Sequence, residues 1–519
     1  MLRLLVAALV AVACLTTSPQ AVGRSADAGP SSMSFQTLAL PEQLLHVDES
    51  DVRLVARLER QMPVLMKDSG VPGLSVGLIR HGEVVWHRGF GVTNVQTGEL
   101  VTDDTVFEAA SLGKSVFGYA VLKLVDQGVI DLDRPLIQYL PGLYGPADDP
   151  RLSLITGRHV LRHTTGLQNW PDGALKTYFT PGERFSYSGE GFVLLSRVVE
   201  RVTGVPTNEF MKRTIFEPLG MTNSSYLWEP SYDKLSTWYH NSRGEVVAGQ
   251  GKSSSSDVNV ASGLRTNGRD YARFLAALLR GDGLKPATRR LVLTTQVPVR
   301  EGGSTTIDRP QAGVFPGVSW GLGVGLQTTA DGLSFWHWGN NSYGKAYFVV
   351  FEKQQTGIVI FANSVYGLSI VPAIVAEAVG GAQPAMTWLR VEPYTSPGRV
   401  LFRKLMADGA IPALRDYFAW RKGRKKSEWL TEDQLNRFGL DLLRSGHVKD
   451  AIEVLKLNVE EHPQSFNVYD SLGEAYAANG DKALAIANYT RSIEINPKNT
   501  DGIAALKKLR GEQGSGEGR

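Results

Sequence analysis

Two chemically reactive patterns overlap in residues 107–125, which read FEAASLGKSVFGYAVLKLV. Gly113 and Lys114 open a Gly-Lys-Ser run like the end of a phosphate-binding P-loop. Ser111 and Lys114 also have the Ser-x-x-Lys spacing of serine hydrolases that form acyl-enzymes. A P-loop needs a further glycine at the position of Glu108, so that backbone N–H groups can wrap the phosphates. The Glu108 carboxylate would repel phosphate, and the P-loop is therefore excluded.

Other serines compete with Ser111 for the role of nucleophile. Ser-x-x-Lys recurs at Ser231 and Ser342, so the spacing alone is weak evidence. Gly-x-Ser-x-Gly, the nucleophile elbow of α/β hydrolases, occurs at Ser75 and Ser319. An elbow serine begins a helix after a strand. Ser75 lies inside a strand-like run and Ser319 precedes a glycine-rich segment, so both are predicted to be structural.

The residues after Ser111 predict a helix that faces the core with one side and ends at Gly128. The residues expected on its buried face are Val116, Tyr119, Leu122 and Leu124. A serine and a lysine three positions apart share one helix face, so the amine can reach the hydroxyl. A free lysine, with a pKa of about 10.4, is protonated and is no base. Burial must lower that pKa; otherwise Ser111 is only a helix cap and Lys114 a surface residue.

The longer context resembles the serine β-lactamase and penicillin-binding-protein superfamily, in particular its class C β-lactamase-like group. The stretch TGELVTDDTVFEAASLGKSVFGYAVLKLVDQGVIDLDRPLIQYLP resembles the family segment around Ser-x-x-Lys. RHTTGL, TPGERFSYSGEGF, IFEPLGMTNS, ASGLRTNGRDYARFL and WHWGNNSYGKAYFVVF resemble later family landmarks, in the same order. The resemblance covers residues 50–380 or so.

The resemblance implies a role for each matching residue. Ser111 would be the acylated nucleophile, and Lys114 its hydrogen-bonded partner and proton carrier. Tyr187 matches the family tyrosine, a general base on the serine or on the deacylating water. A tyrosine pKa of about 10 must be lowered for that role, and the charge of Lys114 could lower it.

A third family element would lie on a strand. His337 would face the substrate, and Gly339 would let the strand edge approach closely. The backbone N–H groups of Ser111 and Asn340 would form the oxyanion hole. His163, although of a catalytic residue type, is predicted to be structural.

Two departures from the family pattern bear on the substrate. Gly189 stands where the family has an asparagine that holds a substrate amide. His337 stands where penicillin-recognising enzymes have a lysine, so a charge that would meet the β-lactam carboxylate is missing. Both changes favour an esterase or peptidase over a true β-lactamase. The implied mechanism needs no metal or cofactor.

The elements around these residues predict an α+β fold. GLSVGLIRHGEVVWHRGFGVTN and KAYFVVFEKQQTGIVIFAN each predict a β-hairpin, and helical stretches lie between them. We expect a β-lactamase-like domain over 46–382, with an antiparallel sheet flanked by helices and a helical subdomain. Strands from its two ends should close one sheet.

The N-terminus predicts export. Residues 1–23 have the short apolar run of a signal peptide, and residues 24–45 read as a linker. Cys14, the only cysteine, lies in the predicted signal peptide and is a weak match to a lipidation site. The expected location is periplasmic or extracellular. A net charge of +3 does not favour nucleic-acid binding, and no stretch is apolar for long enough to predict a transmembrane helix.

The C-terminal part contains a repeat of the tetratricopeptide length. Four pairs recur 34 residues apart: Gly439 and Gly473, Gly446 and Gly480, Ala451 and Ala485, Pro463 and Pro497. This predicts a partly helical connecting segment over 383–430, all-α tetratricopeptide repeats over 431–510 and a disordered tail over 511–519. Two repeats rarely stand alone, so neighbouring helices must cover the stack. Such repeats often dock a protein partner.

Three hypotheses about function follow. The favoured one is a serine hydrolase that acts through an acyl-enzyme on an ester, a small amide or a D-amino-acid peptide. The alternative is a catalytically weak or inactive binding module, for which the substitution at Gly189 argues. The third is an α/β hydrolase that uses Ser75 or Ser319.

Overall fold

The computed structural model of the protein describes residues 44–145, 148–247 and 258–511. The predicted signal peptide, Cys14, nearly all of the predicted linker and all but one residue of the predicted tail lie outside the described residues.

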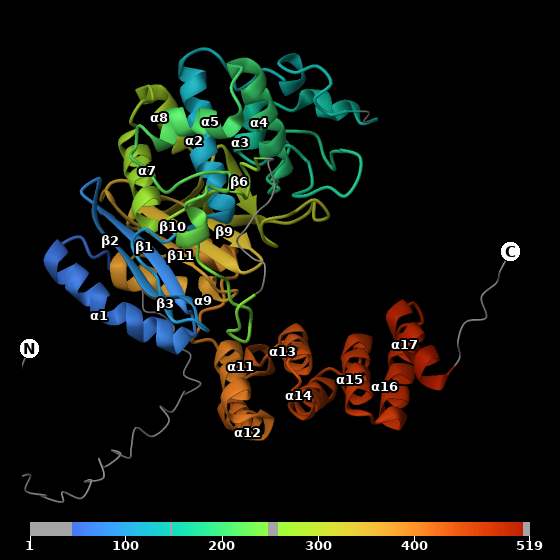
Figure 1. Cartoon of the computed structure of the whole chain (residues 1–519). Coiled ribbons are helices and arrows are strands. Elements are labelled where there is room, and N and C mark those ends of the chain that lie inside the picture. The colour runs from blue at the N-terminus through green and yellow to red at the C-terminus, as the bar shows by residue number, and fades with distance from the viewer. Residues whose placement is uncertain (1–43, 146–147, 248–257, 512–519) are drawn as a thin grey trace, which may run out of the picture. The chain divides into compact units, whose positions relative to one another are not determined.

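A nine-stranded antiparallel sheet organises the described chain as far as α9 (Gly367–Ala378) (Figure 1). The strand order is β3-β2-β1-β11-β10-β9-β8-β7-β6. These strands are β1 (Gly73–Arg80), β2 (Glu83–Asn94), β3 (Glu99–Leu100), β6 (Val297–Arg300), β7 (Val314–Trp320), β8 (Gly325–Thr329), β9 (Gly332–Asn341), β10 (Gly344–Phe351) and β11 (Thr356–Ala362). A separate two-stranded pair joins β4 (Phe107–Glu108) to β5 (Arg265–Thr266).

Strands from the two ends of this part of the chain meet in the middle of the sheet. β1 pairs with β11, and the register runs from Leu74 opposite Ala362 to Ile79 opposite Gly357. Both predicted hairpins form, as β1–β2 and β10–β11. Every residue of β1, β10 and β11 is buried, because helices cover both faces of the sheet. The predicted α+β fold is confirmed.

Two helical layers enclose the sheet (Figure 1). On one face, the helices α1 (Asp51–Ser69), α9 and α10 (Pro384–Trp388) bury their apolar side chains against the strands. The other face carries α2 (Gly113–Asp126), α4 (Glu190–Thr203) and α7 (Gly268–Arg280). Shorter helices complete this part of the fold: α3 (Gly157–Leu161), α5 (Thr207–Met211), α6 (Tyr232–Leu235) and α8 (Pro286–Val292).

The helix predicted after Ser111 is α2, but its environment differs from the prediction. The four residues expected on one buried face are buried, and Phe117, Ala120 and Val121 between them are buried as well. The helix therefore lies inside the domain with apolar neighbours on all sides of its first three turns. Gly128 follows its end with a φ of 75°, the left-handed conformation that glycine adopts freely.

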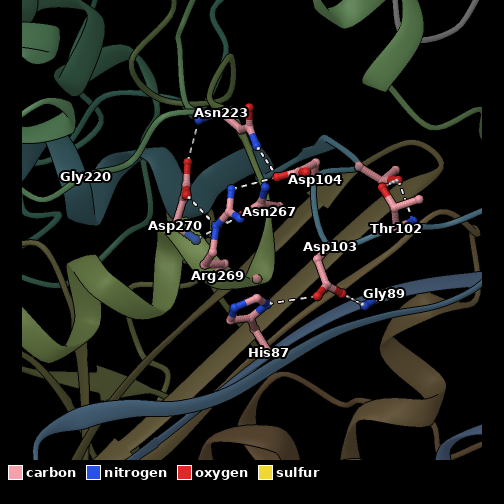
Figure 2. A network of polar contacts seen from close by, with 12 residues as sticks. His87, Gly89, Thr102, Asp103, Asp104, Gly220, Asn223, Asn267, Arg269 and Asp270 are labelled. Atoms are coloured by element: carbon pink, nitrogen blue, oxygen red, sulfur yellow. Dashed lines mark hydrogen bonds and ion pairs between the residues drawn. The ribbon is translucent and has the colours of Figure 1, made fainter.

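A polar network holds the chain segment that leads to Ser111 (Figure 2). The Asp103 carboxylate accepts from Gly89 N–H on β2 (3.0 Å), and Arg269 of α7 pairs with Asp104 (2.8 Å). Asp270, fully buried in the first turn of α7, accepts from the N–H of Asn223 (2.7 Å). Sheet, helix and loop are thus tied together just before β4.

The C-terminal part is all helical. α11 (Pro397–Asp408) and α12 (Ala410–Arg421) precede α13 (Glu432–Arg444), α14 (Val448–Glu461), α15 (Phe466–Asn479), α16 (Lys482–Ile495) and α17 (Thr500–Arg510). α13 packs against α14, and α15 packs against α16. The second pair begins 34 residues after the first. A Cβ on Gly439 would lie 2.4 Å from Leu455, and one on Gly473 would lie 3.1 Å from Tyr489. The recurring glycines let the paired helices cross closely.

The packing of the sheet continues past the expected end of the domain at residue 382. Trp388 of α10 is buried in the core, and its indole N–H donates to the carbonyl of Arg300 (2.8 Å). The first part of the predicted connecting segment is therefore a component of the α+β core. The next helices, α11 and α12, contact α13 and α14 and so cover one end of the helix pairs.

Candidate active site

Ser111 lies in a short 3-10 turn (Ala110–Leu112) between β4 and α2. Ala110 has a φ of 48°, which is uncommon for a residue with a Cβ and marks local backbone strain. The turn is held in place because the N–H of Ala109 donates to the carbonyl of Leu264 (2.8 Å). The Ser111 hydroxyl is presented from a fixed turn at the start of a buried helix.

Lys114 is fully buried, and its amine has two hydrogen bonds. Nζ donates to Ser111 Oγ (3.0 Å) and to the carbonyl oxygen of Ala261 (2.6 Å). Burial lowers the pKa of Lys114 well below its ordinary value, and no described carboxylate lies within 4.0 Å of the amine to oppose this. A neutral amine beside a serine hydroxyl can accept its proton.

Tyr187 packs against the lysine. Lys114 Nζ lies 4.8 Å from the centre of the Tyr187 ring. Burial raises the pKa of Tyr187, and the nearby Ser111 hydroxyl offsets this only in part. The expected lowering of this pKa by Lys114 is not found, because burial is the dominant influence on the phenol. Among the described residues the Tyr187 hydroxyl has no hydrogen-bond partner.

His163 supports Tyr187 and was not expected at the site. The two rings stack with their centroids 4.1 Å apart and their planes at 26°. Nδ1 of His163 accepts from the N–H of Ser188 (3.1 Å), and its backbone has a φ of 56°. Burial lowers the pKa of His163, so the imidazole is a neutral packing partner. The RHTTGL motif marked this residue, but only the fold brings it to Tyr187.

His337 lies inside the aromatic cluster. Its side chain is fully buried, and Nδ1 lies 2.8 Å from the carbonyl oxygen of Trp338. Its ring is edge-on to Tyr187 at 6.1 Å. Burial and the nearby Lys114 lower the pKa of His337 to about 3. The expectation of a substrate-facing His337 is therefore not met: the residue is a neutral part of the wall behind Tyr187.

Gly339 brings β9 against the turn that carries Ser111. A Cβ at Gly339 would lie only 2.5 Å from the carbonyl oxygen of Ala109, so no larger residue fits. The next residue, Asn340, lines a pocket of about 400 Å³ together with Glu108 and Trp170. The end of β9 and the residues before Ser111 thus border one pocket.

Gly189 packs against the aromatic ring of Trp170. A Cβ at Gly189 would lie 2.5 Å from the ring of Trp170, which fills the space that an asparagine side chain would occupy. The N–H of Gly189 donates to Oδ1 of Asn169 (2.7 Å). The Trp170 ring lies 5.9 Å from Lys114 Nζ and is 46% exposed. An open aromatic surface therefore replaces a polar amide beside the lysine.

The competing serines lie in structural positions. Ser75, in β1, is buried, and its hydroxyl accepts a hydrogen bond from the N–H of Gly268 (2.9 Å). This bond joins the sheet to the start of α7. Ser319, in β7, shares a hydrogen bond with the hydroxyl of Thr295 (2.8 Å). Ser231 precedes the short helix α6. Neither elbow serine begins a helix, so the hypothesis of an α/β hydrolase has no support here.

The described residues contain no group of three or more His, Cys, Asp and Glu side chains placed to hold a metal ion. Within the same ranges, no helix combines the length and the apolar composition that a membrane span requires.

Comparison with known sequences agrees with this geometry. The Beta-lactamase family model matches residues 56–376. Esterase EstB of Burkholderia gladioli is 29% identical over 225 residues, which are 37% of this chain and 57% of EstB. Penicillin-binding protein 4* of Bacillus subtilis is 28% identical over 166 residues, which are 28% of this chain and 35% of that protein. The chain thus spans about half the length, or less, of these curated relatives.

Solved structures share the fold. A D-alanine carboxypeptidase AmpC from Burkholderia cenocepacia superimposes with a TM-score of 0.53 at 18% identity. The superposition covers 63% of this chain and 99% of that one. The likeness shows that the two chains share a fold over this part.

Proposed function

Because the chain belongs to the Beta-lactamase family, we propose that it is a serine hydrolase that forms an acyl-enzyme on Ser111. The observation that carries the proposal is the 3.0 Å contact between Lys114 Nζ and Ser111 Oγ, made by a fully buried amine. Burial favours the neutral form of that amine, and a neutral amine is the base that a serine hydroxyl needs.

Acylation proceeds by transfer of one proton and exchange of one bond. Lys114 takes the proton from Ser111 Oγ while Oγ attacks the substrate carbonyl carbon. The tetrahedral intermediate then collapses, the bond to the leaving oxygen or nitrogen breaks, and the lysine proton passes to the leaving group. The Ala261 carbonyl holds the amine in position throughout. In the second half-reaction a water molecule gives a proton to Lys114 and attacks the acyl carbonyl carbon. The bond from that carbon to Ser111 Oγ then breaks, the acyl group leaves as a carboxylic acid, and Lys114 returns the proton to Oγ.

Tyr187 enters this scheme as a neutral phenol. Its raised pKa argues against a phenolate base in the substrate-free enzyme. Its unpaired hydroxyl is instead a donor that can carry a proton between Ser111 and the leaving group. The stacked ring of His163 keeps the phenol in this position.

We assign stabilisation of the oxyanion to the backbone N–H groups of Ser111 and Asn340. This assignment rests on the family pattern, and the close approach of Gly339 to Ala109 supports it. Backbone donors aimed at a developing negative charge contribute strongly to acyl transfer.

Esters with apolar acyl groups are the proposed substrates. Trp170 covers the place where the family asparagine would bind an amide, and it offers an exposed indole face to an apolar group. The relationship to Esterase EstB points in the same direction. D-amino-acid peptides and β-lactams remain the less favoured classes, because Gly189 supplies no amide and His337 no permanent charge.

We further propose that α13–α16 form two tetratricopeptide repeats on an exported enzyme. The 34-residue offset of the helices and the close crossings at Gly439 and Gly473 support the first part. The apolar N-terminal run supports the second. A protein partner is the natural occupant of the repeats.

The deciding experiment measures hydrolysis of p-nitrophenyl esters and labelling by a fluorophosphonate probe, both in wild type and in Ser111→Ala. We expect turnover and one probe adduct in the wild type, and neither in the variant. Persistence of the adduct in Ser111→Ala would overturn the assignment, and Ser75→Ala and Ser319→Ala serve as matched controls. A wild-type protein without turnover or adduct would favour the non-catalytic binding module.

A further inference from the structure

A second pocket, of about 920 Å³, begins at the end of β9 and is completed by the C-terminal helices. Asn340, which also lines the smaller pocket beside Trp170, forms part of its wall. The β10 residue Lys345 and Tyr366, which precedes α9, also line it. Residues of α11 and α13, including Arg399 and Arg437, line it from the helical part of the chain. The α+β domain and the helical part of the chain thus share one pocket at the edge of the candidate site.

Positive charge predominates in this pocket. Its lining cations are Arg243, Arg390, Arg399, Arg437, Arg444 and Lys345, and its lining carboxylates are Glu392 and Asp441. Several cations have nearby partners. Arg243 pairs with Glu245, Arg437 lies 3.8 Å from Glu392, and Arg444 lies 3.9 Å from Asp441.

Arg399 is a buried lining cation that these carboxylates do not neutralise. Its side chain is buried, its guanidinium lies 3.1 Å from the centre of the Tyr366 ring, and no described carboxylate lies within 4.0 Å. Nε and Nη1 have no hydrogen-bond partner among the described residues. The neighbouring Glu392 is engaged by Ser396 and by Gln434 (both 2.9 Å). Two donors of this pocket-lining side chain therefore lack a hydrogen-bond partner, and both nitrogen atoms are themselves buried.

The position of Arg399 in its helix adds to this unpaired charge. Arg399 lies in the first turn of α11, where its N–H is capped by Ser396 Oγ (3.2 Å). The start of a helix carries partial positive charge, so a cation there is electrostatically unfavourable unless an anion is bound nearby. A buried, unpaired charge is costly. Binding of an anion would satisfy both the helix end and the guanidinium.

Lys345 brings a further cation to the site side of the pocket. It lies directly opposite Asn340 in the β9–β10 pair, and Nζ donates to Asn340 Oδ1 (2.6 Å). The family lysine is absent at His337, three residues before Asn340 on the same strand. The neighbouring strand β10 thus supplies a cation beside the end of β9.

We propose that this pocket binds a carboxylate at the far end of the substrate, so that the enzyme prefers esters whose acyl chain ends in a negative charge. The inference rests on the proposed ester hydrolysis and specifies its substrate class. Guanidinium groups bind carboxylates through paired, charge-assisted hydrogen bonds, and Arg399 has donors free for them. The helical part of the chain is then a component of the substrate site.

The test compares mono-p-nitrophenyl adipate with p-nitrophenyl hexanoate, which have acyl chains of equal length with and without a terminal carboxylate. The full-length wild type should favour the adipate ester. In Arg399→Gln the adipate-to-hexanoate ratio of kcat/KM should fall about tenfold, as expected for a lost charge-assisted hydrogen bond. The fall should come from a higher KM for the adipate ester. Arg437→Gln, at a 56% exposed side chain, should lower it about threefold without a risk to folding.

The matched control is Arg290→Gln, an exposed arginine of α8 outside the pocket, which should leave the ratio unchanged. An unaltered ratio in both Arg399→Gln and Arg437→Gln would overturn the proposal. If the wild type hydrolyses neither ester, the proposed function fails, and calorimetric titration with adipate tests the pocket directly. Adipate binding that weakens in Arg399→Gln supports the pocket, whereas absence of binding, or binding of inorganic phosphate alone, refutes it.

Discussion

Single residues set the reactivity of this site through burial. Lys114 has no charged partner within 4.0 Å among the described residues, and the loss of water around it favours the neutral amine. The same burial raises the pKa of Tyr187 and lowers that of His337 to about 3. Burial therefore favours the uncharged form of all three groups.

The pH dependence of acylation should report the buried lysine. Below the pKa of Lys114 the amine holds a proton and cannot accept that of Ser111, so the rate should fall as pH falls. Because this pKa is lowered, the rate should reach its plateau well below pH 10. Stopped-flow labelling with a fluorophosphonate across pH measures the profile.

Lys114→Arg should lose about 10²- to 10⁴-fold in acylation rate, because arginine stays protonated. Lys123→Arg, on the same helix, is the matched control and should keep the wild-type profile. A plateau retained in Lys114→Arg would exclude the lysine as the base.

Trp170 and Gly189 should behave as a coupled pair. Gly189→Asn alone should destabilise the protein by about 1–3 kcal/mol, because its Cβ would overlap the Trp170 ring. Trp170→Ala alone should raise KM for apolar esters. The double variant should recover stability, since the alanine makes room for the asparagine. Thermal unfolding of the wild type, the two single variants and the double variant completes a double-mutant cycle. Strictly additive effects on stability would contradict the packing described for this pair.

Contacts between secondary-structure elements hold the turn of Ser111 in place. The 3-10 turn of Ser111 contacts β9 at Gly339, and the polar network around Asp270 fastens the preceding segment to β2 and α7. Hairpins and helices of this kind were predictable, because their apolar patterns are local. The packing of Trp170 on Gly189 was not, because it joins loops whose contact no periodicity records. The raised pKa of Tyr187 was missed for a similar reason, since it depends on how deeply the folded chain buries the phenol.

Asp270 should prove important for stability although it is remote from the reaction. Removing its carboxylate leaves Asn223 N–H unpaired and Arg269 and Arg273 less compensated. Asp270→Ala should lower the free energy of unfolding by about 3–5 kcal/mol. Asp270→Asn, which keeps the shape and one acceptor, should lower it less. Urea denaturation measures both, and equal losses would show that the charge and its hydrogen bonds do not matter.

At the scale of the whole molecule, the helical part is more than an appendage to the sheet. Phe402 of α11 packs against Tyr366 and against Phe438 of α13, and these elements border the arginine-lined pocket. The 34-residue repeat was visible in the sequence, but the pocket was not. Arg399 and Asn340 are about 60 residues apart, and only the folded chain brings them to one cavity.

The two helix pairs should differ in their effect on catalysis. Gly439→Val wedges α13 away from α14 and disturbs the helix that carries Arg437, so hydrolysis of the adipate ester should weaken while that of the hexanoate ester persists. Gly473→Val makes the same change one repeat later, outside the pocket lining. It should cost about 1–3 kcal/mol of local stability and leave both activities intact. Equal effects of the two variants on the adipate ester would contradict a specific role for α13.

The pairing of β1 with β11 has a consequence for the order in which the protein forms. The middle of the sheet can form only after Leu74 has paired with Ala362, which lies nearly three hundred residues later in the chain. Contacts so distant in sequence slow folding, because the intervening loop loses its freedom before any pairing is gained. The turn of Ser111 is synthesised early, yet its neighbour β9 and the closing strand come late. A nascent chain should therefore carry the proposed nucleophile in an unassembled form until synthesis has passed the last strand.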